Sequence, residues 1–308
     1  MIKNALLTII FFTSLVIAHE ETPVKLVVLG IAQDAGYPQL NCYRPHCMPA
    51  WEDTTLKKMA VSLGLIDSQN KKKYLFEATP DIRQQMYNLH TLAPDSRCAL
   101  DGVFLTHAHM GHYTGLMHFG REAAGTKELN VFAMPKMKKF LEDNGPWSQL
   151  VKLKNIVIKD LQHQIKVPLT NNVTIKPIIV PHRDEFSETV GYNIYGPNKS
   201  VLFIPDINKW EKWDYDILTE IKKVDYALLD ATFYKNGEIP NRDMSEIPHP
   251  FVEESMKLFS TLSKKDKNKI IFIHFNHTNP LIDYSSDSAK SVLSQGYRIA
   301  TEGLQISL

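Results

Sequence analysis

The chain has 308 residues, of which 44% are hydrophobic, and 35 Lys and Arg residues nearly balance 34 Asp and Glu residues for a formal net charge of +1. A chain of this length and composition can bury a sizeable core as one large domain. The balanced charge argues against a nucleic-acid-binding surface, which would carry a basic excess. We therefore expect an enzyme-sized globular protein whose partner is a small-molecule substrate.

Residues 1–18 have the layout of a secretory signal peptide. Lys3 supplies a positive charge, residues 5–18 are almost wholly apolar, and Val16 and Ala18 are the small residues before a cleavage point. A membrane anchor is the alternative, but the apolar run is shorter than the ~20 residues that span a bilayer. There is also no Cys at the cleavage point for lipid attachment. We expect an exported protein, periplasmic or secreted, with no stable membrane insertion after cleavage and with residues 19–308 as a single domain.

The first strand is expected at residues 24–30, and a loop with two of the three cysteines follows it. In an oxidising compartment Cys42 and Cys47 could form a disulfide, which would leave Cys98 buried and free. Alternatively, Cys42, His46 and Cys47 could hold a structural metal with one further ligand. The spacing leaves both possibilities open.

The next strands are expected at residues 59–66 and 74–76, with the polar stretch 67–73 as a hairpin tip. A helix should follow, because Thr79 suits an N-cap, Pro80 the first helical position and Asp81 the first turn. Asp81 also follows a buried strand. It could therefore hold a metal-bound His or water in place, besides its electrostatic role at the helix start.

A cluster of histidines follows the short apolar run at residues 102–105. His107 and His109 are two residues apart, so both side chains should leave the strand end on the same side. Gly111 permits a sharp turn, after which His112 arrives from another direction ahead of a helix expected to include residues 117–121. Imidazoles gathered in this way favour a borderline metal such as zinc.

The same pattern recurs at later strand ends. His182 follows the apolar run 178–180, Asp206 follows 200–204, Asp230 ends 226–229, and His274 follows 270–273 with His277 shortly after. An Asp or His at the end of a strand adds nothing to the packing of a hydrophobic core. In α/β folds, however, functional sites are commonly built from side chains at several strand ends. The histidines that lack this context are expected on the surface or in packing roles: His19, His46, His90, His118 and His163.

The segment from His107 to His112 resembles the His-x-His-x-Asp-His signature of the metallo-β-lactamase superfamily, with Gly111 where the signature has Asp. The candidate ligands also follow the superfamily order over nearly the whole mature chain. A closer resemblance is to the coenzyme PQQ synthesis protein B group. It rests on four short motifs: residues 36–42, 79–85, 230–233 and 274–280.

This resemblance implies an α+β fold, the αββα sandwich, in which two mixed β-sheets lie between helical layers and metals bind at one edge of the sheets. It implies that His107, His109 and His182 hold a first metal and that Asp206 bridges. His112 and His274 would hold what remains of a second site, and His277 is the rival of His274. Asp81 and Asp230 would support the ligands or handle protons.

The function implied is a zinc-dependent hydrolase of an ester, cyclic phosphodiester, amide or lactone. A metal-bound hydroxide would attack, Asp206 would orient it, and Asp230 or His277 would protonate the leaving group. The same ligands could instead hold iron or manganese, as an oxygenase or oxidase related to PQQ biosynthesis would require. A non-catalytic exported metal-binding protein is the third possibility. Because Gly111 removes one carboxylate, we expect one tight metal and a weaker second one, which Gly111→Asp should strengthen.

Overall fold

The computed structural model describes residues 22–94 and 100–308, so the expected signal peptide and Cys98 lie outside the described residues. Two seven-stranded sheets form the centre, and both are mixed, with antiparallel pairs on one side and parallel pairs on the other. In spatial order, the first sheet consists of β14 (Gln305–Ser307), β1 (Val24–Gly30), β2 (Ser62–Asp67), β3 (Lys72–Phe76), β4 (Gly102–Phe104), β5 (Leu129–Ala133) and β6 (Ile156–Asp160). The second consists of β13 (Arg298–Ile299), β12 (Ile270–Ile273), β11 (Tyr226–Asp230), β10 (Ser200–Ile204), β9 (Val190–Tyr195), β8 (Thr174–Ile179) and β7 (Val167–Pro168).

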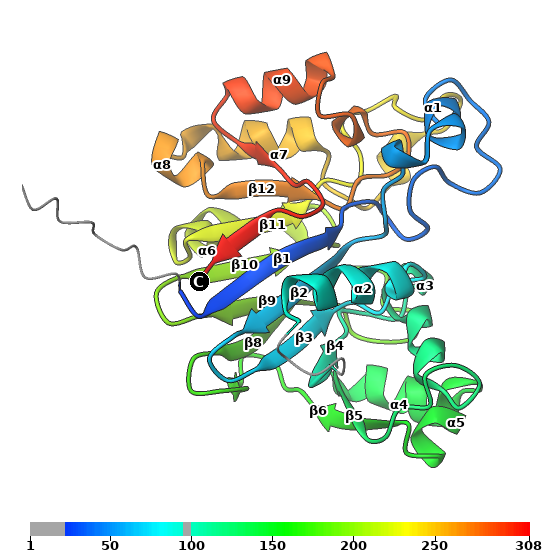
Figure 1. The fold of residues 1–308 in the computed structure, drawn as a ribbon. Helices are drawn as coiled ribbons and strands as arrows, with labels where there is room; N and C mark the ends of the chain where they lie inside the picture. Colours follow the sequence, from blue (N-terminus) through cyan, green and yellow to red (C-terminus); the bar gives the residue numbers. More distant parts are fainter. Residues whose placement is uncertain (1–21, 95–99) are drawn as a thin grey trace, which may run out of the picture.

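Helices cover the outer faces of both sheets, as Figure 1 shows. On the first sheet lie α2 (Ile82–Leu92), α4 (Pro135–Asp143) and α5 (Trp147–Lys152), and on the second lie α6 (Ile217–Lys222), α7 (Val252–Leu258), α8 (Lys264–Lys267) and α9 (Asp287–Ser294). The short α1 (Met48–Glu52) and α3 (Met110–Tyr113) belong to loops. This arrangement is the αββα sandwich expected from the sequence.

Alternation along β1 explains why the layers form. Leu26 and Val28 enter the core between the two sheets, whereas Val27 and Leu29 enter the core beneath α2, α4 and α5. Both faces of this strand are therefore buried from Leu26 onward, which is why residues 26–29 are continuously apolar rather than alternating with polar residues. The loop that follows β1 therefore starts from a rigid strand that is covered on both faces.

The segment after β1 joins the two sheets. Ala32 forms parallel bridges both to Ala60, just before β2, and to Phe275, just after β12. The Gln33 amide donates to the Phe275 carbonyl at 2.8 Å. The loop after β1 of the first sheet is thus fixed against the end of β12 of the second.

Two local expectations need correction. The helix after β3 begins at Ile82 with Asp81 at the N-cap, and the Thr79 hydroxyl accepts from the Asp81 amide instead of capping the helix. The helix expected to include residues 117–121 is a 3-10 helix, η2 (Thr114–Phe119), which follows the short α3 and ends before Arg121.

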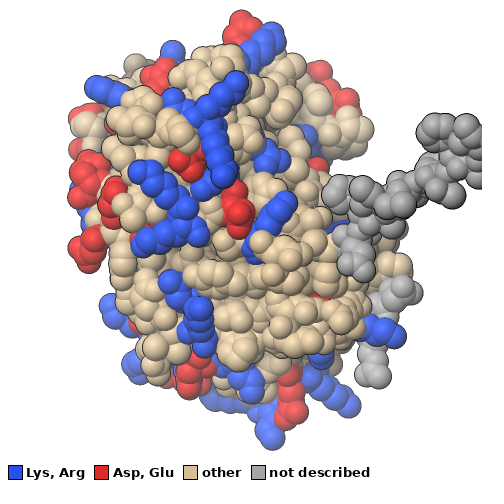
Figure 2. Space-filling view, turned by 90° about the vertical axis from the view of Figure 1, so that its left-hand side faces the viewer, with Lys and Arg blue, Asp and Glu red and all other residues tan. Residues whose placement is uncertain are grey.

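The surface is mixed in charge. On the face shown in Figure 2, Lys and Arg side chains alternate with Asp and Glu around broad uncharged areas. Across residues 22–94 and 100–308, no helix is long and apolar enough to cross a membrane.

Candidate metal centre

The predicted ligands meet at one edge of the two sheets. Each of them follows the end of a strand: β4 for the three clustered histidines, β8 for His182, β10 for Asp206 and β12 for His274. The structure brings all of these side chains together in two adjoining clusters.

The first cluster contains His107, His109, His182 and Asp206, whose ligand atoms lie within 4.8 Å of one another. One Asp206 oxygen, Oδ2, lies 3.4 Å from His107 Nε2, and the other, Oδ1, lies 3.2 Å from His182 Nε2. His107 Nε2 and His109 Nδ1 are 2.8 Å apart. This is a hydrogen-bond distance, and it places both ring nitrogens at the same cluster.

The second cluster contains Asp34, His112 and His274, again with ligand atoms within 4.8 Å. His112 Nε2 lies 3.4 Å from Asp34 Oδ1 and 3.9 Å from Asp206 Oδ2. Asp206 therefore lies between the clusters and faces both. Asp34 was not a candidate ligand from the sequence.

These side chains fit a metal better than they fit one another. Ligands held about 2.0–2.2 Å from a tetrahedral zinc are about 3.3 Å apart, which matches the 3.2–3.4 Å separations between imidazole and carboxylate atoms. Several of the buried atoms also have no hydrogen-bond partner among the described residues: Asp34 Oδ1, Asp206 Oδ1, His274 Nε2 and both ring nitrogens of His112 and of His182. Unpaired buried polar atoms are costly, so their convergence fits a site that binds a cation.

The electrostatic environment keeps most of the candidate ligands in the protonation state that binds a metal. Burial lowers the pKa of His107 well below its usual value and that of His274 to about 4, so both rings are neutral. Burial opposes ionisation of Asp206, but His182 and His249 outweigh it and hold its pKa well below the usual value. His112 is different: against burial, the Glu77 and Asp34 carboxylates raise its pKa to about 10. A cation bound at this cluster would replace that proton.

A further set of contacts orients the rings. The Thr106 hydroxyl lies 2.9 Å from His107 Nδ1, which leaves Nε2 for the cluster. His109 Nε2 lies 3.0 Å from the exposed Glu185 carboxylate, which leaves Nδ1 facing inward. Such partners fix the tautomer and orientation of metal-binding histidines.

Asp230 supports the cluster from behind. It is fully buried, and its oxygens accept from the Ile207 and Thr232 amides and from the Thr232 hydroxyl. The same hydroxyl lies 2.9 Å from His274 Nδ1, so a chain of hydrogen bonds turns His274 Nε2 toward the cluster. His249 Nδ1 lies 2.9 Å from Asp230 Oδ2 and 3.1 Å from Asp206 Oδ1. Asp230 thus positions other residues.

Two predicted site residues lie elsewhere. Asp81 accepts a hydrogen bond from the Ala60 amide at 2.8 Å and fastens the loop before β2, so it does not support the metal ligands. His277 lies beside His46 and Cys42, not beside His274, because the chain turns away after Phe275. Of these two histidines, His274 is therefore the one that lies in the cluster.

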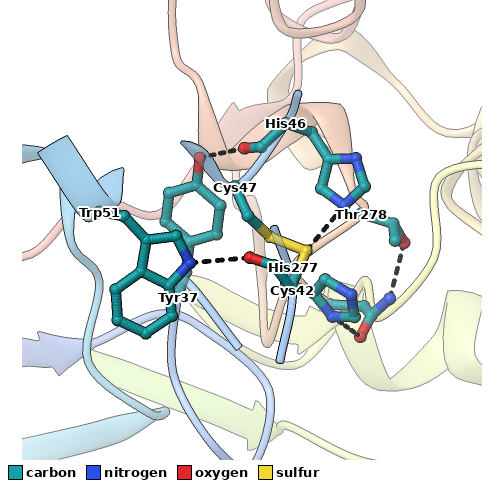
Figure 3. Close-up of a disulfide and its surroundings, with 8 residues drawn as sticks. Tyr37, Cys42, His46, Cys47, Trp51, His277 and Thr278 are labelled. Atoms are coloured by element: carbon teal, nitrogen blue, oxygen red, sulfur yellow. Dashed lines mark hydrogen bonds between the residues drawn. A yellow bond between two sulfur atoms is a disulfide. The ribbon is translucent and has the colours of Figure 1, made fainter. Parts of the chain in front are cut away.

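His277 belongs to a third group, shown in Figure 3. Cys42 and Cys47 form a disulfide, Cys42 Sγ lies 3.4 Å from His46 Nε2, and the His46 and His277 rings are 5.7 Å apart between centroids. The two cysteines and the two histidines are also residue types that can together hold a structural metal. Of the two possibilities left open by the sequence, the structure contains the disulfide.

The sequence reasoning missed three residues of the centre. Glu77, fully buried with its Oε1 3.6 Å from His112 Nδ1, directly follows β3 and carries the strand-end signal used for the other ligands. Asp34 lies a few residues beyond β1, and its role depends on the loop shape. His249 lies in the loop before α7 and follows no strand, so only the structure reveals it.

Comparisons with known proteins agree with this fold. Residues 72–275 match the family described as Beta-lactamase superfamily domain. Coenzyme PQQ synthesis protein B of Acinetobacter baumannii (strain ACICU) is 24% identical over 312 aligned positions, covering 92% of this chain and all of the relative. The fold and the site define a metallo-β-lactamase-type protein. The chain belongs to the metallo-β-lactamase superfamily, in the group that resembles coenzyme PQQ synthesis protein B.

Two solved structures show the same fold. Zn(2+)-bound PqqB from Methylobacterium extorquens has a TM-score of 0.75 at 22% identity, with 92% of this chain and 100% of that chain covered. A diphosphatase from the PhnP family has a TM-score of 0.62 at 21% identity, with 92% and 96% covered.

Proposed function

We propose that this protein is a metal-dependent hydrolase of a small-molecule ester, cyclic phosphodiester, amide or lactone, with zinc as its metal. The observation that carries the proposal is the pair of adjoining clusters with Asp206 between them, because their unpaired ligand atoms match the ligand set of a hydrolytic metal centre. The zinc in the Methylobacterium relative and the diphosphatase activity named for the PhnP-family structure support it.

A metal in the first cluster would act as a Lewis acid and lower the pKa of a bound water toward ~7. The protein side chains supply the rest. Asp206 faces both clusters and can orient the attacking group, while Asp230 and His249 hold that carboxylate in place. His109 and Asp34 are the partly exposed members, at 16% and 37% of their side-chain area, so substrate reaches the centre on their side.

The sequence-based assignment of the leaving-group proton to Asp230 or His277 is not retained. Both Asp230 oxygens are engaged with neighbours inside the protein, and His277 is in the disulfide group. Glu185 is an exposed carboxylate at the edge of the centre, 46% exposed and 3.0 Å from His109 Nε2. We assign to Glu185 the role of orienting His109 at the entrance to the centre.

The test is a metal analysis and a substrate screen on mature protein purified without added metal. We expect zinc as the main metal and turnover on at least one class within a panel of p-nitrophenyl esters, bis-p-nitrophenyl phosphate, anilides and lactones. Asp206→Asn should abolish turnover, and His118→Ala, which changes a histidine outside the clusters, should not. Iron as the retained metal, with oxygen consumption and no hydrolysis, would favour the oxygenase alternative instead.

We also propose that the protein is exported and works without a nucleic-acid partner. The apolar segment at residues 5–18 and the presence of a disulfide support export to an oxidising compartment.

A further inference from the structure

The glycine that interrupts the histidine motif lies against another part of the chain. A Cβ placed on Gly111 would come within 2.2 Å of Asp34 Cα, 2.6 Å of Asp34 Oδ1 and 2.8 Å of the Asp34 carbonyl oxygen. Real Cβ atoms do not approach other atoms so closely. Asp34 therefore occupies the space into which any side chain at position 111 would extend.

The loop that carries Asp34 is fixed on both sides. Ala32 bridges the two sheets, Gln33 donates to the Phe275 carbonyl, and the Gly36 amide donates to the Gln33 carbonyl at 3.0 Å. Asp34 itself has φ of +35°, in the left-handed region that costs energy for a residue other than glycine, although Asp tolerates it better than most. Strain of this kind persists where the surrounding structure enforces it and is concentrated at functional sites.

The Asp34 carboxylate is directed at the second cluster. Oδ1 is buried, has no hydrogen-bond partner among the described residues and lies 3.4 Å from His112 Nε2. His274 Nε2 is likewise buried and unpartnered. Asp206 Oδ2 lies 3.9 Å from His112 Nε2, on the side of the first cluster. Two imidazoles, one carboxylate and one shared carboxylate form a complete set of four ligands for zinc.

We propose that Asp34 is the carboxylate ligand of the second metal and takes the place of the Asp that Gly111 lacks in the superfamily signature. The carboxylate reaches the same cluster from the loop after β1 instead of from the histidine motif. The protein then holds two metals per chain, both firmly, instead of one firm and one weak. This inference rests on the proposed metal centre but fails or succeeds separately from the proposed hydrolysis.

The test measures metal stoichiometry, not activity. Wild type, Asp34→Asn and Asp34→Ala are loaded with zinc under non-reducing conditions, dialysed and analysed for metal per chain, with the Cys42–Cys47 disulfide verified by mass so that its thiols bind none. We expect two zinc ions in wild type and one in both variants, because the amide and the methyl group remove the anionic ligand. Chelator competition should show the second ion at least roughly tenfold weaker in Asp34→Asn.

Asp53→Asn is the matched control, since it makes the same change at an exposed carboxylate outside the clusters, and it should retain two ions. Thermal melts establish that each variant is folded, and Asp34→Ser replaces any variant that is not. Two ions retained in the Asp34 variants would overturn the proposal, as would a wild type that holds one. Two ions in wild type without turnover on any substrate would instead reject the hydrolase function and leave the ligand assignment intact.

Discussion

Glu77 faces His112 inside the protein, with Oε1 3.6 Å from His112 Nδ1 and neither side chain exposed to solvent. The carboxylate is on the far side of the ring from Asp34 and Asp206, which both face Nε2. A carboxylate behind a metal-binding imidazole fixes the tautomer and raises the basicity of the ligand nitrogen.

Glu77→Gln should therefore weaken the second metal roughly 10–100-fold without removing any ligand. The measurement is zinc affinity by chelator competition, with the ion in the first cluster as an internal reference. Glu122→Gln, at an exposed carboxylate, is the control. Unchanged affinity in Glu77→Gln would mean that Glu77 only balances charge in the metal-free protein.

Loss of a ligand from the first cluster should have a larger effect. His107→Ala or His109→Ala removes one of three imidazoles, so we expect the first metal to be lost on dialysis. Elemental analysis of each variant, beside His118→Ala, checks this. Full metal content in the double variant His107→Ala/His109→Ala would disprove the assignment of the centre.

Gly111→Asp should not strengthen the second site, contrary to what the motif alone suggests. Its Cβ would collide with the Asp34 backbone, so the loop must move and the Asp34 carboxylate with it. We expect a loss of about 1–3 kcal/mol of unfolding free energy from overpacking, together with weaker zinc binding.

Gly111→Ala adds the colliding Cβ without the charge of Asp, so we expect it to lose a similar amount of stability. Gly145→Ala is a suitable control, because a Cβ there meets nothing within 4 Å. Thermal melts and zinc titrations of the three variants provide the comparison. A stable Gly111→Asp protein with tighter zinc would show that the loop after β1 adjusts without cost.

The disulfide should contribute modest stability. It closes a short loop, with a sequence separation of 5, and the entropy of loop closure then corresponds to about 2 kcal/mol. Melts of the oxidised protein and of Cys42→Ser/Cys47→Ser, each with and without reductant, test this. Reductant should lower the Tm of wild type only. If reduced wild type regains its Tm with zinc, the group formed with His46 and His277 also serves as a metal site.

The N-terminus is the last prediction. Expressed in a host with a working export pathway, the mature chain should begin at or near His19. Intact mass of protein from the periplasm or medium checks this. Retention of Met1 in a cytoplasmic product would contradict it.

Strand ends made much of this centre predictable from the sequence. His107, His182, Asp206 and His274 each follow an apolar run, and such runs become central strands whose ends meet at one edge of the sheets. The resemblance to a known family supplied the αββα layers, which apolar runs alone do not define.

The positions of residues in loops could not be predicted in this way. Asp34 and His249 reach the centre through loops whose paths depend on tertiary contacts, such as the fixing of Gln33 to Phe275. Asp81 was misplaced for the same reason, since its carboxylate turns toward the Ala60 amide rather than the cluster. His277 shows how a few residues beyond a strand end are enough to reach a different group.

The bridge of Ala32 to both sheets bears on when the metals can bind. Asp34 comes from the beginning of the described chain and His274 from near its end, so the second cluster exists only after both sheets have formed and been joined. If the chain, exported as proposed above, crosses the membrane unfolded, it carries no such cluster with it. Its metals would then come from the compartment in which it folds, and the zinc available there, rather than in the cytoplasm, would set how much of the protein is loaded.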